Sequence, residues 1–389
     1  MNVAPLTVDS GPWTLGSVTL LNNIFNADDW ARVPFHFWSL VLFVLGCIVG
    51  SFLNVCIHRM PIGQSIVSPP SHCPHCKYSI PWWLNVPLFT WLWLRGKCKN
   101  CGAPISIRYF LVELLTGVVF LSCWLTFGER FPFVALVFCV FLAGLIVATF
   151  IDFELYIIPD EITIGGMVVG FFISFFLPEL HAQDSAVNGM FSSLLGIGAG
   201  AGLIYFILRL GKLLFGRQKI SIPESGRIIF TEIAVHLPGQ EIPYEEIFYR
   251  QSDTIKLQAR TVELCDRSYK DVPVRLSLLS KVLRIGEEEL NPETVAYMEV
   301  AATEIVLPRE AMGLGDVKFM GAIGAFLGWQ AVVFTLAVSS GIGAVVGVTL
   351  IALGKRERSK YLPYGPYLAM AAAIWIFFGP RLWRMVFEW

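Results

Sequence analysis

The stretch FPFVALVFCVFLAGLIVATFIDFELYIIPDEIT, residues 131–163, sets the class of fold. It begins with about twenty almost wholly apolar residues, the length that a helix needs to cross a hydrocarbon core of about 30 Å. Four acids, Asp152, Glu154, Asp160 and Glu161, follow at once. Pro159 breaks the first helix and favours a second one with Asp160 in its first turn. The stretch therefore predicts a helix that ends at a membrane boundary.

The composition of the whole chain agrees with a membrane protein. Of its 389 residues 55% are hydrophobic and 15% are charged, and the mean hydropathy is +0.63, far from the values of soluble domains. We expect a mainly α fold, a polytopic helical bundle of about eight spans. The apolar segments are 36–57, 109–127, 131–151, 159–177, 190–214, 314–330, 331–353 and 361–379.

Lysine and arginine collect in alternate loops, which predicts the orientation of the spans. The clusters lie at 58–59, 95–108, 212–219 and 355–360, and all face the cytoplasm if both termini lie outside. Arg381 and Arg384 are the contrary signal. The first 34 residues lack a basic region, so we expect the first span to be retained. The net charge of −1 and the absence of a concentrated basic face exclude nucleic acid as an expected partner.

A cysteine-rich loop separates the first two spans. Cys73, Cys76, Cys98 and Cys101 form two C-x2-C pairs at a separation that suits a tetrahedral zinc site, which would give a short loop its folding energy. Two disulfides or a redox-active pair are the alternatives. A reducing cytoplasmic face and the lack of a thioredoxin-like βαβ pattern disfavour both.

A second polar segment, near residues 217–305, separates the fifth and sixth spans. The runs RIIFTEIAV, TIKLQARTVEL and VRLSLLSKVLRI alternate apolar and polar residues with the period of two that is typical of strands. They predict a small β-rich domain with a docking, regulatory or structural role, because the segment shows no nucleophile, metal or phosphate motif.

Asp152 and Asp316 are the candidate catalytic residues. Each lies near the expected cytoplasmic end of an apolar span, where a carboxylate is costly and is a functional-site hypothesis by default. Two close carboxyl groups can share one proton, so that one acts as base toward water and the other as acid toward a peptide carbonyl. Proton relay in a transporter would use the same residues, with Asp160 as another possible partner. Gly313 and Gly315 leave room for a close backbone approach, although helix packing also explains glycines here.

Five motifs in register resemble those of the bacterial type IV prepilin peptidases. They are GSFLNVCIHRMP at 50–61, the two cysteine pairs with ISIRYFLVELLTG at 105–117, IDFELYIIPDEIT, GLGDVKFMGAIGAFLGW and YLPYGPYLAMAA at 361–372. The resemblance covers most of the chain apart from the N-terminal thirty or so residues and the segment near 217–305, where family members commonly have a short loop.

The resemblance implies an aspartic endopeptidase of the bacterial inner membrane, with its active site facing the cytoplasm. Such enzymes remove the short basic leader of prepilins and pseudopilins, and those with the cysteine-rich loop usually also N-methylate the new terminus with S-adenosylmethionine. The family's aspartates fall on Asp152 and Asp316, and its four cysteines on Cys73, Cys76, Cys98 and Cys101. Substrate would lie along Gly313 and Gly315, near Lys318. A role for Glu113 in substrate binding or methyl transfer is a hypothesis.

The expected organisation follows from these observations. It comprises an extracytoplasmic segment 1–34, a first span 35–58, a zinc-binding loop 59–108, spans two to five in 109–215, an inserted β-rich domain 216–308 and spans six to eight in 309–389. The expected partners are prepilin substrates, the lipid bilayer and pilus or secretion assembly machinery. Two other classes of function stay open, a proton- or cation-coupled transporter and a non-catalytic assembly scaffold.

Overall fold

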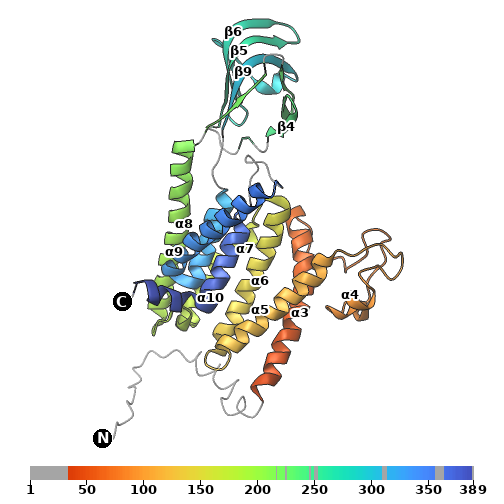
Figure 1. Cartoon of the computed structure of the whole chain (residues 1–389), viewed down its shortest axis with the longest axis vertical. Helices are drawn as coiled ribbons and strands as arrows, with labels where there is room; N and C mark the ends of the chain where they lie inside the picture. Colours follow the sequence, from red (N-terminus) through yellow and green to blue (C-terminus); the bar gives the residue numbers. More distant parts are fainter. Residues whose placement is uncertain are drawn as a thin grey trace. The chain divides into compact units, whose positions relative to one another are not determined.

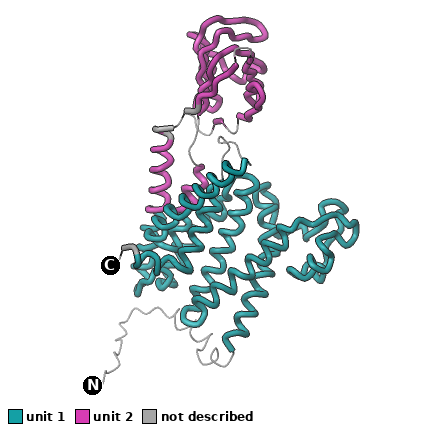
Figure 2. The backbone as a smooth tube through the Cα atoms, in the orientation of Figure 1, with its two compact units in different colours: residues 1–198, 321–389 teal, residues 199–320 magenta. Residues whose placement is uncertain are grey.

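The computed structural model describes residues 34–215, 217–223, 226–244, 247–248, 253–308, 313–354 and 363–387. It divides into two compact units, one made of residues 1–198 and 321–389 and the other of residues 199–320 (Figure 2). Two expectations concern residues outside the described ranges: the N-terminal segment, except for Pro34, and the basic cluster at 355–360.

Helices build the first unit (Figure 1). They are α3 (Phe35–Arg59), α4 (Phe89–Trp93), α5 (Ile107–Phe127), α6 (Pro132–Leu155), α7 (Asp160–Phe176), α8 (Ala186–Phe215), α9 (Leu314–Ala352) and α10 (Gly365–Phe387), of which α8 and α9 continue into the second unit. Among the described residues, five helical segments are long and apolar enough to cross a membrane: Phe35–Ile62, Ile107–Phe127, Pro132–Leu155, Ala186–Gly211 and Leu314–Ala352. The predicted membrane protein is therefore confirmed.

Helix α6 is the centre of this unit, in contact with α3, α5, α7 and α10. It starts at Pro132, whose missing N–H costs nothing in a first turn. It ends where Tyr156 takes a left-handed conformation and its amide bonds to the carbonyl of Asp152 at 3.0 Å. Helix α7 begins directly after Pro159, with Asp160 and Glu161 in its first turn. The helix boundary predicted at Pro159 is confirmed.

Glycines let α3 and α5 pack backbone to backbone. A Cβ at Gly46 would lie 2.8 Å from the Cα of Gly117, and one at Gly50 would lie 2.7 Å from the Cα of Glu113. Gly46 and Gly50 are four residues apart, so they share one helix face, which is the spacing of close helix pairs in membranes. Any larger side chain at these positions would separate the two helices.

Helix α9 bends at Gly328, whose φ of 79° and ψ of 175° are not helical. The break lies close to the boundary predicted between residues 330 and 331. It leaves the carbonyl of Ala325 available, and Ser193 Oγ donates to it at 2.9 Å. His181, in the 3₁₀ turn Pro178–His181, also bonds to the Ala325 backbone, and its Nε2 lies 2.8 Å from Ser174 Oγ. Polar side chains from α7, α8 and the turn between them thus hold the bend.

One antiparallel sheet with a one-sided apolar core forms most of the second unit. Its strands are β1 (Arg217–Ser221), β2 (Ile228–Phe230), β3 (Ala234–Leu237), β4 (Gln240–Pro243), β5 (Ile255–Leu264), β6 (Ser268–Ser277), β7 (Val282–Ile285), β8 (Glu288–Leu290) and β9 (Met298–Pro308). Their order is β4-β3-β2-β9-β5-β6-β7-β8, with β1 also paired to β9. Alternate residues of β5 and β9 are buried, as the period of two predicts. The predicted β-rich segment is confirmed.

The two ends of this sheet meet. Strand β9 pairs along one edge with β5 and along its other edge first with β2 and then with β1, so that Arg217 lies opposite Pro308. The chain therefore enters the sheet from α8 and leaves it toward α9 at neighbouring points. An insertion with adjacent ends can fold as its own unit without separating the helices that flank it.

Stability should depend on pH through His181, because burial lowers the pKa of this side chain from 6.5 to about 4. Between these values the unfolded chain binds a proton that the folded chain does not, so the free energy of unfolding falls as the pH decreases, by about 3 kcal/mol at most. We expect His181→Gln to lose this part of the pH dependence of the melting temperature in detergent. An unchanged slope in the variant would contradict the assignment.

Candidate active site and metal centre

The side chain of Asp152 lies buried in the last turn of α6, with 5% of its surface exposed. Its Oδ2 accepts a hydrogen bond of 2.9 Å from the amide of Gly365, the first residue of α10. The first amides of a helix have no partner within it and carry partial positive charge, so they favour a carboxylate. A Cβ at position 365 would lie 2.7 Å from that oxygen. Only glycine therefore lets the start of α10 approach the acid this closely.

The other acids of residues 150–163 have separate roles. Glu154 forms an ion pair with Arg108, which joins the end of α6 to the start of α5. Asp160 and Glu161 lie in the first turn of α7, where the helix dipole stabilises negative charge. Asp152 is the one acid of the four that is buried.

Asp316 lies in the first turn of α9 and is buried, with 9% of its surface exposed. Gly313 precedes the helix and is exposed, and a Cβ there would lie 3.7 Å from Asp316 Oδ2. Gly315 and Lys318 are half-buried. A carboxylate beside an open glycine backbone is an arrangement that an extended peptide could approach. Asp316 belongs to the second compact unit and Asp152 to the first.

Glu113 lies buried on α5 and connects this span to the cysteine-rich loop. Its Oε2 accepts a hydrogen bond of 2.7 Å from the amide of Leu88, the residue before α4. Leu88 has a φ of 59°, which a non-glycine residue adopts only where its surroundings hold it. The carboxylate of Glu113 therefore fixes the loop against the first turns of α5.

The four cysteines lie in two equivalent turns. The amide of Lys77 bonds to the carbonyl of Cys73 and the amide of Gly102 bonds to that of Cys98, each at 2.9 Å. Lys77 and Gly102 both have positive φ, at the same place in each turn. Each turn is closed by its own antiparallel β-bridge, between His72 and Ser79 in the first and between Lys97 and Pro104 in the second. The loop thus uses one type of cysteine turn twice.

The sulfur atoms fit a tetrahedral metal ion. All four lie within 4.8 Å of one another, with Cys73 3.8 Å from Cys101 and Cys76 4.0 Å from Cys98. Zinc–sulfur bonds of about 2.3 Å in a tetrahedron place sulfurs about 3.8 Å apart, whereas a disulfide needs about 2.05 Å. A hydrogen bond from the side chain of Asn100 lowers the pKa of Cys76 to about 6, which favours the thiolate that a metal binds. The arrangement therefore suits a metal and not a pair of disulfides.

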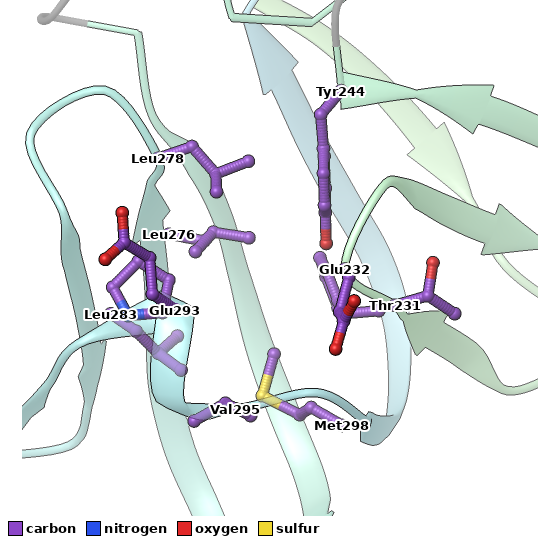
Figure 3. A pocket seen from close by; sticks show the side chains of 11 residues that line it. Thr231, Glu232, Tyr244, Leu276, Leu278, Leu283, Glu293, Val295 and Met298 are labelled. Carbon is purple, nitrogen blue, oxygen red and sulfur yellow. The ribbon is translucent and has the colours of Figure 1, made fainter.

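The inserted sheet contains a cavity of about 320 Å³ (Figure 3). Leucine, valine and methionine side chains line much of it, and Thr231, Glu232, Tyr244 and Glu293 add polar atoms. Glu293 also pairs with Lys281 at 2.9 Å. The cavity holds none of the acids or cysteines that the motifs single out.

Comparison with protein families gives two matches, and the second includes part of the sheet. Residues 44–127 match the bacterial peptidase A24 N-terminal domain, and residues 139–219 and 270–348 match the type IV leader peptidase family. Together the matches cover more than half of the chain. With its membrane-spanning helices, the chain is a membrane peptidase. It belongs to the type IV leader peptidase family.

Individual relatives agree with this assignment. The chain is 27% identical to the prepilin leader peptidase/N-methyltransferase of Aeromonas hydrophila, over 90% of this chain and 94% of that protein. It is 26% identical to the protein of the same name from Stutzerimonas stutzeri, over 88% and 91%. A match of 39% identity to the Myxococcus xanthus protein of this name spans 48% of the chain and 58% of that relative. No solved structure matches the chain significantly.

Sequence reasoning missed Gly365 as a site residue. This glycine lies in the motif YLPYGPYLAMAA, and the motif alone does not assign it a role. The available signal was the Gly-Pro pair at the start of an apolar segment, which predicts a helix N-terminus and hence free amides. The hydrogen bond from the Gly365 amide to Asp152 joins residues 213 positions apart, so no local pattern could predict it.

Gly365→Ala should disturb the position of the Asp152 carboxylate, because the new Cβ displaces either this carboxylate or the start of α10. A hydrogen bond to a charged group contributes about 1.5–3 kcal/mol, so we expect at least about a tenfold loss of peptidase activity. Gly165→Ala in α7 is the matched control, since its Cβ would meet no atom within 4 Å. Equal activity of the two variants would argue against a positioning role for Gly365.

Cys98→Ser should remove a thiolate from the metal centre. We expect the purified wild type to carry about one zinc ion per chain and the variant to lose it, with the cysteine-rich loop becoming sensitive to protease. Cys265→Ser, which changes an exposed cysteine outside the cluster, should keep the metal. Elemental analysis and limited proteolysis test this, and a metal-free wild type would refute it.

Proposed function

We propose that this chain is an aspartic endopeptidase that removes the leader peptide of type IV prepilins and pseudopilins. The observation that carries the proposal is the buried Asp152 at the end of α6, held by Gly365, in a member of the type IV leader peptidase family. Relatives named prepilin leader peptidase/N-methyltransferase align over nearly the whole chain, which supports the same substrate class.

Asp152 and Asp316 are the proposed catalytic pair. Phe141 of α6 stacks on Phe326 of α9, with ring centroids 4.5 Å apart. On the proposed topology the third span ends and the sixth span begins at the cytoplasmic face, so both acids are proposed to lie on that side of the membrane.

The proposed chemistry needs the pair to share one proton. The ionised aspartate takes a proton from water as the water oxygen attacks the scissile carbonyl carbon, and the protonated aspartate gives its proton to the carbonyl oxygen. The tetrahedral intermediate then collapses with transfer of a proton to the leaving amine. The amide of Gly365 stabilises the negative charge on Asp152 and fixes the direction of its second oxygen.

Four further residues are proposed to serve the substrate. The exposed Gly313 and the half-buried Gly315 leave the backbone before Asp316 open to an extended peptide, and Lys318 orients the substrate or adjusts the acidity of Asp316. Glu113 acts through its bond to Leu88, which sets the position of the loop 59–108 against α5. Its contribution to substrate binding or methyl transfer is thus indirect.

The cofactors belong to different steps. Zinc at Cys73, Cys76, Cys98 and Cys101 is proposed to be structural, because four thiolates would complete its coordination and would leave no position for water. N-methylation of the new terminus would use S-adenosylmethionine, which supplies the methyl group.

We propose eight spans in the bacterial inner membrane, counting α7, the two parts of α9 and α10 with the other long helices. The proposed segments are 1–34 outside, 35–58 as the first span, 59–108 as the zinc loop, 109–215, the insertion 216–308, and 309–389. On this topology both catalytic aspartates face the cytoplasm. Pilus or secretion assembly machinery is a further proposed partner of the chain.

Cleavage of a prepilin with a basic leader tests the proposal. We expect the purified wild type in detergent to cut it, and Asp152→Asn and Asp316→Asn to be slower by about 10² to 10⁴, the contribution of general acid–base catalysis. Asp160→Asn, which changes an exposed acid in the next helix, should keep the activity.

The same variants, with two further measurements, separate the peptidase from the transporter and the scaffold. Cleavage that persists in either catalytic variant would refute the pair. A wild type that cuts no such leader but moves protons in vesicles would favour the transporter. Assembly of pili in cells that carry only the two inactive variants would favour a scaffold.

A further inference from the structure

The cysteine-rich loop exposes a group of large apolar side chains, which we call the aromatic patch. The exposed fractions are 80% for Trp82, 56% for Trp83, 60% for Phe89, 58% for Leu92 and 73% for Trp93. Phe89, Leu92 and Trp93 are spaced as neighbours on one face of α4, and the rings of Phe89 and Trp93 lie 5.7 Å apart. Exposed apolar groups of this size mark a surface that another phase or molecule covers.

The opposite side of α4 is attached to a membrane-spanning helix. The ring of Trp91 lies 5.3 Å from that of Phe110, and its Nε1 donates to the carbonyl of Ile105 at 3.3 Å. The amide of Leu88 bonds to Glu113. Phe110 and Glu113 lie in the first two turns of α5, within about 10 Å of its start. The patch is therefore held beside the end of a span, at the depth of the membrane interface.

The charges around the patch suit an anionic surface. Residues 59–108 contain no aspartate or glutamate but six lysines and arginines: Arg59, Lys77, Arg95, Lys97, Lys99 and Arg108. Arg108 pairs with Glu154 and Arg59 is buried, which leaves Lys77, Arg95, Lys97 and Lys99. These four basic groups still outnumber the two net negative charges that four thiolates around a divalent ion would carry. Tryptophan rings prefer the headgroup level of a bilayer, and lysine and arginine beside them attract anionic lipids.

We propose that residues 82–93 insert the aromatic patch into the headgroup region of the cytoplasmic leaflet, with Arg95, Lys97 and Lys99 against anionic lipid. The loop then lies on the membrane surface and is fixed to α5, so the four cysteines are held at a constant height above the bilayer. A basic substrate segment meets a surface whose positive charge is partly neutralised by lipid.

The test uses the full-length protein in phosphatidylethanolamine–phosphatidylglycerol vesicles and follows tryptophan fluorescence. Subtracting the emission of a triple variant, Trp82→Tyr, Trp83→Tyr and Trp93→Tyr, from that of the wild type isolates the patch. We expect this component to be quenched by lipids brominated near the carbonyl end of their chains and protected from aqueous acrylamide. Unchanged zinc content and melting temperature of the variant show that the fold is intact.

Other outcomes overturn the proposal. Quenching of the component by acrylamide alone would place the patch in water, and protection from both quenchers would mean that a protein surface covers it. Trp91→Tyr gives the internal control, because its component should be protected from both. Equal lipid quenching in purely zwitterionic vesicles would refute the role of the basic residues.

Discussion

A carboxylate inside an apolar helical bundle must be given hydrogen-bond donors, and this requirement organises the first unit. Asp152 is on α6, which contacts helices on several sides, and the donor is the amide of Gly365 at the start of α10. Two local features make the contact possible. The left-handed Tyr156 and Pro159 end α6 directly after the acid, and the missing side chain at position 365 lets the helix start approach.

Small residues also allow close contact between helix backbones elsewhere in the bundle. Gly46 and Gly50 bring α3 against α5, and Gly196 and Gly324 bring α8 against α9 so closely that no Cβ fits. In lipid, where apolar side chains gain little by leaving their solvent, such close backbone packing is a main source of helix association. The bend at Gly328 adds a polar cluster to this frame, since the carbonyl freed there needs partners.

The features that follow from local sequence patterns were predictable. The length of the apolar segments indicated the spans, and Pro159 indicated the helix boundary. The alternation of apolar and polar residues indicated the inserted strands, and the two C-x2-C pairs indicated the cysteine cluster. Three features were not, because each depends on distant residues or on backbone conformation: the bond from Gly365 to Asp152, the bond from Leu88 to Glu113, and the bend of α9, which spans 39 residues as one helix. The last helix also differs from the apolar segment 361–379, as α10 runs from Gly365 to Phe387 and includes Pro380.

The inserted sheet begins and ends on paired strands, with Arg217 opposite Pro308. Any folded segment could connect α8 to α9 in this way, provided that its two ends lie close together. The junction between α8 and α9 is therefore a site that tolerates insertion. A folded module can be gained, exchanged or lost there during evolution while the rest of the membrane enzyme stays the same. The same junction offers a position for a fluorescent protein or an affinity module, because the chain already carries a folded sheet there.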